Sequence, residues 1–338
     1  MRTIGYALAF LAGITGCSRA GSSPSATEAS TPIIASPTEA RERDPENLPD
    51  VTWPRAPMPP GKAWLKCDWS EKAPTQITEM SAQVLLPLML DCWHDGKVTN
   101  FELTYKGEIG KGFTDLIARM NELARRFEVT TLSLSMDSGG GDVMEAISAG
   151  NLLAKANWRV SVPNDANCYS ACVLVLAAGS VRAIGGNVGI HRIIPVNSSA
   201  KSRDQLNDEL NGVHDQVTTY LAKNGVAKTV SDLMMTVPAG DIRILTREEL
   251  KNFGLWWTNA AQADLARLAL IQKCGKDYVT RRDTFIQSAT QCQNGERSEA
   301  GFAAYSKCMD ALADELGLPD SKCPESPSAI MLERGPSG

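Results

Sequence analysis

Strand-like and helix-like patterns alternate along the middle of the chain, and this alternation limits the fold more than any other feature. Polar and apolar residues alternate at 100–105 and again at 131–136, which is typical of strands. Between them, residues 113–127 place apolar side chains at helical spacing. The same patterns predict further strands at 158–162 and 188–191 and further helices at 143–156 and 169–178. We therefore expect an α/β fold of repeated strand–helix units around a mainly parallel sheet.

The rest of the chain is expected to be helical. Residues 203–224 form a long amphipathic pattern. Thr246 and Glu249 predict a capping box at the start of a helix that ends before Gly254. From about residue 258 the sequence is Ala-rich and carries four cysteines, Cys274, Cys292, Cys308 and Cys323. We expect a small helical appendage tied by two disulfides, and the sequence does not choose among the three possible pairings.

The first residues have the pattern of an export signal. A positive start at Arg2 precedes an apolar run at 4–14, which is too short to span a bilayer permanently. The segment at 14–17, Ile-Thr-Gly-Cys, resembles a bacterial lipobox, so Cys17 is expected to carry a lipid and to begin the mature chain. The alternative is an ordinary signal peptide in which Cys17 is incidental. No other stretch reaches the roughly 18 apolar residues that a membrane helix needs.

Export determines where the protein is expected to act. A lipid on Cys17 would hold it at the periplasmic side of a bacterial membrane, whereas without the lipid it would be secreted or soluble in the periplasm. Of the 9 cysteines, all except Cys17 would then lie in an oxidising compartment. An even number of cysteines there permits disulfides, and Cys67 with Cys92 is one possible pair.

Length and composition suggest the domain organisation. The 338 residues suffice for about two domains, and the apolar share of 43% permits a sizeable core. The net charge of −5 gives no reason to expect a nucleic-acid partner, which favours a basic surface. Ser, Pro, Ala, Thr and Glu dominate the stretch before residue 61, which cannot bury enough apolar surface to fold. The expected parts are a signal peptide at 1–17, a disordered tether at 18–60, a small segment at 61–97, an α/β domain at 98–257 and a helical cysteine-containing region at 258–338.

Three consecutive glycines, Gly139, Gly140 and Gly141, follow the strand expected at 131–136. Glycine lets the backbone turn sharply. Successive N–H groups in such a turn can form a nest that binds an anion or an oxyanion. A plain turn explains the glycines equally simply, so this segment alone does not assign a function.

Ser170 and His191 are the two residues that could carry nucleophilic chemistry. Ser170 lies at the expected start of an apolar helix, where the positive end of the helix dipole would stabilise negative charge. The simpler interpretation is an N-cap serine. His191 ends a β-type run and could equally be a buried structural residue.

In their order along the chain, these segments resemble the Clp-type peptidases of the ClpP/crotonase fold, which include exported bacterial relatives. That family has a Ser-Pro-Gly-Gly turn after a strand, a serine nucleophile, a histidine base and a later acidic residue. The triple-glycine turn matches with glycine in place of proline, Ser170 matches the nucleophile and His191 the base. Asp241, in a stretch that ends with Gly-Leu, matches the acid. The resemblance covers about residues 98–257, under half of the chain.

The resemblance implies a serine peptidase with a Ser-His-Asp triad. His191 would take the proton of Ser170 during attack on a peptide carbonyl, and Asp241 would orient His191. The N–H groups of Gly141 and Ala171 would form the oxyanion hole. Neither a cofactor nor a metal is expected, because the chain has no HExxH motif and no zinc-type spacing of Cys and His.

Cys168 and Cys172 flank Ser170, which is unusual. Three interpretations are open: a pair of buried thiols, a disulfide that would stiffen the turn at the serine, or a thiol nucleophile facing His191. The other two histidines, His94 and His214, are not expected to take part in catalysis.

The expected activity is therefore hydrolysis of peptide bonds outside the cytoplasm. ATP is not available there, so we expect unfolded or short peptide substrates and no ATPase partner. Members of the family often self-assemble, and the helix expected at 203–224 offers a surface for a homo-oligomer. One alternative is a non-catalytic binding or scaffold protein that has kept the fold. Another is an acyl-CoA or other thioester hydrolase, against which export argues because CoA is cytosolic.

Overall fold

The computed structural model describes residues 53, 58, 60–67, 73–92, 100–194, 198–292 and 298–334. All of them fall within the unit Asp44–Gly338. The expected signal peptide, most of the tether expected at 18–60, Cys17 and His94 lie outside the described residues. The prediction of a disordered tether is wrong at its end, where Trp53 packs against the main core and the Pro60 carbonyl accepts the Glu108 N–H at 3.2 Å. Among the helices that the structure describes, none combines the length and the apolar character needed to cross a membrane.

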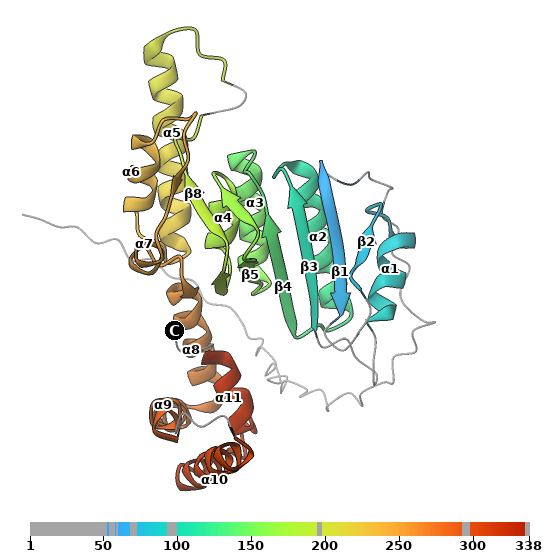
Figure 1. Ribbon diagram of the computed structural model, residues 1–338, viewed down its shortest axis with the longest axis vertical. Helices are drawn as coiled ribbons and strands as arrows, with labels where there is room; N and C mark the ends of the chain where they lie inside the picture. Colours follow the sequence, from blue (N-terminus) through green and yellow to red (C-terminus); the bar gives the residue numbers. More distant parts are fainter. Residues whose placement is uncertain are drawn as a thin grey trace, which may run out of the picture. The chain divides into compact units, whose positions relative to one another are not determined.

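A mixed sheet rich in parallel pairs forms the centre of the fold (Figure 1). Its strands are β1 (Gly61–Cys67), β2 (Thr75–Ile77), β3 (Asn100–Gly107), β4 (Thr131–Asp137), β5 (Arg159–Val162), β7 (Val181–Ile184) and β10 (Trp257–Thr258). Within the described residues the order across the sheet is β10-β7-β5-β4-β3-β1-β2. The central pairs are parallel, whereas β1 and β10 pair antiparallel at the two sides. The predicted α/β class with a parallel-rich sheet is confirmed.

Two helices make the crossovers between neighbouring parallel strands. Parallel strands cannot be joined by a tight turn, so each connection needs a longer segment, usually a helix. Helix α2 (Lys111–Arg126) connects β3 to β4, and α3 (Val143–Lys155) connects β4 to β5. Figure 1 shows both helices running along the sheet. The side chain of Asp142 caps α3, because its carboxylate accepts the N–H groups of Met144 and Glu145 at 2.8 and 2.9 Å.

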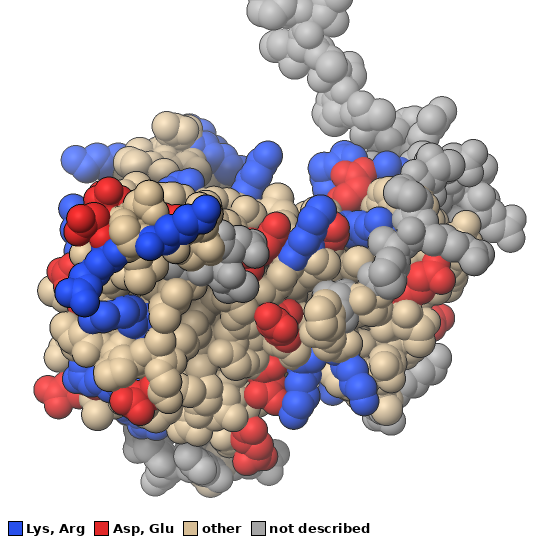
Figure 2. All heavy atoms as spheres, turned by 90° about the horizontal axis from the view of Figure 1, so that it is seen from above, with Lys and Arg blue, Asp and Glu red and all other residues tan. Residues whose placement is uncertain are grey.

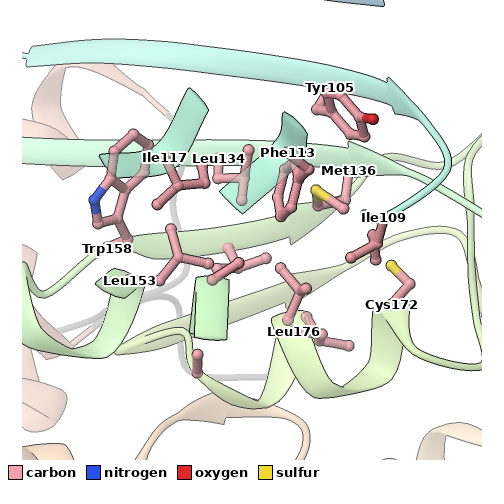
Figure 3. Close-up of a cluster of buried hydrophobic side chains, with 14 of the residues drawn as sticks. Tyr105, Ile109, Phe113, Ile117, Leu134, Met136, Leu153, Trp158, Cys172 and Leu176 are labelled. Atoms are coloured by element: carbon pink, nitrogen blue, oxygen red, sulfur yellow. The ribbon is translucent and has the colours of Figure 1, made fainter. Parts of the chain in front are cut away.

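The main core lies between this sheet and its helices (Figure 3). The rings of Phe101 and Trp158 meet edge to face with their centroids 5.7 Å apart. Burying a large apolar side chain contributes about 1.5–3 kcal/mol. The apolar residues predicted on one face of α2 are all buried: Phe113, Leu116, Ile117, Met120, Leu123 and Ala124.

A second, smaller sheet consists of β6 (Asn167–Tyr169), β8 (Asn187–Ile190) and β9 (Arg243–Ile244). The pair β6–β8 is parallel and the pair β8–β9 is antiparallel. Helix α4 (Cys172–Ala177) contacts β5 of the large sheet and both β6 and β8 of the small one. The helix predicted at 169–178 therefore begins later than expected, since Tyr169 belongs to a strand and Ser170 to a turn.

The remaining helices of this part are α1 (Ala82–Asp91), α5 (Arg203–Lys223), α6 (Thr229–Thr236) and α7 (Arg247–Asn252). Helix α5 agrees with the amphipathic pattern at 203–224. The capping box of α7 is confirmed, with the Glu249 N–H donating to Thr246 Oγ1 at 3.2 Å. The possible pair Cys67–Cys92 forms a disulfide that joins β1 to the end of α1.

Residues 260–334 have a buried cluster of their own. Their elements are α8 (Ala260–Cys274), α9 (Lys276–Ser288), the 3-10 helix η2 (Ala289–Cys292), α10 (Glu299–Glu315) and α11 (Pro327–Arg334). Disulfides join Cys274 to Cys323 and Cys292 to Cys308. The helical character and the two disulfides agree with prediction, and the structure selects one of the three pairings.

Charged residues of both signs lie side by side on the face that Figure 2 shows, with uncharged residues between them. Exposed ion pairs such as Lys111–Asp115, at 2.8 Å, contribute little to stability because water and salt screen them. In the part of the chain that the structure describes, no group of His, Cys, Asp and Glu side chains is arranged to hold a metal ion.

Candidate active site

Ser170 lies on the turn between β6 and α4, in an unusual backbone conformation. Its φ is +57°, a left-handed value that costs a residue other than glycine about 1–3 kcal/mol. Such a conformation persists only where the surroundings fix it. The Ser170 N–H donates to the Gly189 carbonyl at 3.0 Å, and the Ser170 carbonyl accepts the Val173 N–H at 3.0 Å. The N-cap of α4 is Ala171, so the interpretation of Ser170 as an N-cap is wrong.

The triple-glycine turn packs directly against Ser170. Gly140 has a φ of +115°, and a Cβ added there would lie 2.7 Å from Ser170 Cβ and 3.2 Å from Ser170 Oγ. Gly141 has a φ of +144°, and an added Cβ would lie 2.1 Å from the Ile109 carbonyl oxygen. At Gly139 an added Cβ would meet nothing within 4 Å. Only Gly140 and Gly141 are therefore required by close approach and by a positive φ.

Two backbone N–H groups beside Ser170 have no acceptor in the described part of the chain. They belong to Gly141 and Ala171, the two residues expected to form an oxyanion hole. The Gly140 carbonyl and the Asp142 N–H on either side of Gly141 both bond to Ile109, each at 2.8 Å. Ala171 is fully buried. Buried N–H groups without a partner are rare in proteins, so the Ala171 N–H is available to an acceptor from outside the fold. Gly141 is partly exposed, so its N–H can reach the same acceptor.

The pairing of β6 with β8 brings His191 alongside Ser170. Tyr169 lies opposite Gly189 in this parallel pair, so Ser170 and His191 follow their strands at the same end of the sheet. Neighbouring strands lie about 4.8 Å apart. The ring of His191 is partly exposed, and its Nδ1 atom lies 2.9 Å from the Arg192 carbonyl oxygen. No described hydrogen bond joins the imidazole to Ser170 Oγ.

Asp241 lies at the same end of the small sheet but is not joined to His191. The antiparallel pairing of Ile190 with Arg243 places Asp241 just before β9, near the end of β8. Its N–H donates to the Pro238 carbonyl at 3.1 Å. Its side chain is exposed and makes no hydrogen bond to any described residue. Ser170, His191 and Asp241 thus lie at the same end of the small sheet, but no hydrogen bond connects the Asp241 carboxylate to the His191 ring in the described residues.

A polar network ties the glycine turn to β6. Asp137, at the end of β4, accepts the Lys106 ammonium at 2.7 Å and the Asn167 N–H at 3.1 Å. Asn167 in turn accepts the Tyr169 hydroxyl at 2.7 Å. Burial by itself would raise the pKa of Asp137, but the hydrogen bonds from Lys106 and Asn167 outweigh burial and lower this pKa. The charged carboxylate therefore stabilises the position of the turn relative to Ser170.

Cys168 and Cys172 are joined by a disulfide, and both are fully buried. Of the three interpretations left open by the sequence, the structure supports the disulfide. A sulfur in a disulfide has no thiolate, so neither cysteine can serve as a nucleophile in this state.

His214 lies in a different part of the fold. Its Nε2 atom is 3.0 Å from Asp232 Oδ1, between α5 and α6. A small hollow there is lined mainly by apolar residues: Ile193, Leu210, Val213, His214, Val217, Ser231, Met234 and Met235. None of Ser170, His191 and Asp241 lines this hollow, so its chemistry is separate from theirs.

Sequence reasoning missed two backbone groups at the site, the carbonyls of Gly189 and Arg192. The first accepts the Ser170 N–H and the second faces the His191 ring. The sequence does carry a signal for Gly189, because a glycine inside a strand often marks a close approach of another chain segment. An added Cβ there would lie 2.5 Å from Ile242 Cγ2 and 2.8 Å from Tyr169 Cδ1. The contact of the Arg192 carbonyl with the His191 ring depends on the backbone conformation after β8, which no local pattern predicts.

The comparisons with known proteins add one structural likeness. No protein-family model matches the sequence, and no curated protein is similar to it. Among solved structures, a mutant of the 1510-N membrane-bound stomatin-specific protease is similar to this chain. It has 17% sequence identity and a TM-score of 0.36, over 48% of this chain and 80% of that one. A likeness at this level assigns neither fold nor activity, so we derive the function from the geometry of this chain.

Proposed function

We propose that this chain is a serine peptidase of the Clp-like type, with Ser170 as the nucleophile and His191 as the general base. The observation that carries the proposal is the backbone of Ser170. It is held at a φ of +57° between the glycine turn and the carbonyl of Gly189, beside two N–H groups that have no described acceptor. A strained serine next to unused donors is typical of a site that stabilises an oxyanion.

The chemistry follows from these positions. Ser170 Oγ attacks the peptide carbonyl carbon while its proton passes to Nε2 of His191. The carbonyl oxygen becomes an oxyanion that accepts the N–H groups of Gly141 and Ala171. The C–N bond then breaks, and His191 returns the proton to the leaving amine. Water repeats the same steps on the acyl-enzyme and releases the acid.

Asp241 has the role of orienting His191 in this proposal. For that role its carboxylate must take the place of the Arg192 carbonyl beside Nδ1, which requires the segment before β9 to move. A carboxylate there would also stabilise the imidazolium that forms during attack.

The expected cellular setting follows from the sequence. With an export signal and a lipid on Cys17, the enzyme would act on the periplasmic side of a membrane. The three disulfides that join distant parts of the chain are consistent with an oxidising compartment. The substrates are proposed to be unfolded or short peptides, cleaved without an ATPase partner, a metal or a cofactor. Helix α5 is proposed as a surface for a homo-oligomer.

One observation favours a non-catalytic alternative. The exposed Asp241 side chain, which bonds to no described residue, would suit a binding or scaffold protein that has kept the fold but lost the triad. The peptidase and the scaffold differ in one measurable respect, which is turnover at Ser170.

Cleavage of an unfolded protein tests the proposal. The full chain, purified in detergent, is incubated without ATP with a dye-labelled reduced protein that cannot fold. We expect cleavage by the wild type, none by Ser170→Ala, and wild-type cleavage by Ser148→Ala, which removes an exposed hydroxyl on α3. Failure of a correctly folded wild type to cleave any such substrate would support the scaffold.

A further inference from the structure

We infer that the Cys168–Cys172 disulfide positions the Ser170 hydroxyl by holding the serine in its left-handed backbone conformation. This inference rests on the proposed role of Ser170 as the nucleophile. Cys168 and Cys172 are thus positioning residues, which act on the reaction only through Ser170.

The bond encloses the turn that carries the serine. Its two cysteines have a sequence separation of 4, and their Cα atoms are 5.1 Å apart. Four steps of extended chain would span about 13 Å, so the bond requires the chain to reverse between β6 and α4. The reversal is made at Ser170, where φ is +57°. A relaxed serine would return to negative φ, and the ring formed by the bond opposes that change.

Both ends of the ring are anchored in rigid parts of the fold. Cys172 lies in the main core with Ile109 and Leu176 nearby (Figure 3), and no part of it is exposed. Cys168 forms a parallel bridge with Ser138, the residue just before the glycine turn. The disulfide therefore connects the strand that borders the glycine turn to the helix that follows the serine. Ser170 cannot shift relative to Gly140 without moving one of these two anchors.

The short ring distinguishes this bond from the other three disulfides. Stabilisation of a whole domain by a crosslink grows with the length of chain that it closes. The separations are 25 for Cys67–Cys92, 49 for Cys274–Cys323 and 16 for Cys292–Cys308, against 4 for Cys168–Cys172. The bond around Ser170 therefore contributes least to global stability, and its main effect is local.

Removal of the bond should affect the chemical step more than substrate binding. A displacement of about 1 Å at a reacting atom lowers the rate roughly 100-fold. We expect kcat to fall by about 10- to 100-fold with little change in KM, because the bond acts on the position of the Ser170 hydroxyl.

The test uses a double variant, Cys168→Ala with Cys172→Val, in which valine refills the space of the buried sulfurs. The matched control is Cys67→Ala with Cys92→Ala, which removes a disulfide of larger separation away from Ser170. Three quantities are measured on each protein: the rate of labelling by a fluorophosphonate, kcat and KM on a peptide, and hydrogen exchange of the Ser170 amide. The single variant Cys172→Ala repeats the test should the double variant not fold.

The inference predicts slow labelling, low kcat and fast exchange of the Ser170 amide in the Cys168–Cys172 variant alone. Equal labelling rates and equal exchange in the variant and the wild type would overturn it. The inference would also be wrong if neither the Cys168→Ala, Cys172→Val double variant nor the Cys172→Ala single variant folded, because the bond would then support the whole domain. Failure of the proposed function looks different, since the wild type itself would not be labelled while the exchange comparison would still report on the backbone of Ser170.

Discussion

The Nδ1 atom of His191 lies 2.9 Å from the carbonyl oxygen of Arg192. A carbonyl oxygen can only accept a hydrogen bond, so in the neutral ring Nδ1 carries the proton and Nε2 is left as the acceptor. This is the tautomer that a general base needs in order to take a proton from Ser170. The fold therefore provides that tautomer without help from Asp241.

This contact predicts that substitution of His191 lowers kcat more than substitution of Asp241 does. His191→Ala should lower kcat by about 10²- to 10⁴-fold, which is the usual contribution of a general base. Asp241→Asn should lower kcat much less, because the Arg192 carbonyl still selects the tautomer. Steady-state kinetics of both variants, with thermal unfolding as the check on folding, measure the difference. Equal losses would mean that the carboxylate controls the imidazole after all.

The packing of the glycine turn against Ser170 predicts that alanine is harmful at Gly140 and tolerated at Gly139. Gly140→Ala should abolish labelling of Ser170 and destabilise the protein by about 1–3 kcal/mol, because its Cβ would meet the serine at a φ of +115°. Gly139→Ala is the matched control, since an added Cβ there meets nothing within 4 Å. Labelling rates and urea unfolding of the two variants provide the comparison. The packing of the turn against Ser170 would be contradicted if Gly140→Ala behaved like Gly139→Ala.

Asp137 predicts a loss of stability in acid. Its pKa is lowered in the folded state by hydrogen bonds from Lys106 and Asn167, which outweigh the opposing effect of burial. The stabilisation is therefore complete above the unfolded pKa of about 3.9 and is lost as the pH falls through the lower folded pKa. In thermal unfolding between pH 2 and pH 7, the wild type should exceed Asp137→Asn in stability near neutrality, and the two should converge in acid. A difference that is independent of pH would rule out this carboxylate as the cause.

The buried position of Arg182 predicts that its removal strongly lowers the free energy of unfolding. The side chain is fully buried, and its guanidinium donates to the carbonyls of Ala177, Asn224 and Gly254, each at the end of a helix. Burial lowers its pKa to about 10, so it stays charged at neutral pH. Arg182→Met would leave these carbonyls without a donor, and we expect a loss of at least about 3 kcal/mol in urea unfolding. Arg125→Met, which changes an exposed arginine, is the control. A similarly small loss of stability in both variants would show that the three carbonyls find other hydrogen-bond donors.

Regular elements with a clear period could be predicted from the sequence. The apolar spacing at 113–127 and the alternation at 131–136 correspond to α2 and β4 within a few residues. Amphipathic periodicity works there because each element buries one face on the same core. The short strands β6 and β7 and the helix α6 escaped prediction, because elements of 3 to 8 residues carry too little pattern.

The start of α4 shows why the details of the site escaped prediction. The apolar run after Ser170 suggested a helix from Tyr169 onward, whereas the helix begins at Cys172. The turn at Ser170 depends on distant partners, namely the glycine turn and the carbonyl of Gly189, which the local sequence does not reveal. The sequence proposed Ser170, His191 and Asp241, which the structure places at one end of the small sheet, but the hydrogen-bond partner of His191 could not be predicted.

Mapping of a covalent adduct is the sharpest test of Ser170 as the nucleophile and His191 as the general base. The full-length protein is treated with a fluorophosphonate, digested, and analysed by mass spectrometry of the peptide that contains Ser170. The proposed role of these two residues predicts one phosphonate per chain, carried by Ser170, and no adduct in either Ser170→Ala or His191→Ala. A folded wild type that remains unlabelled, or an adduct on a serine other than Ser170, would contradict it.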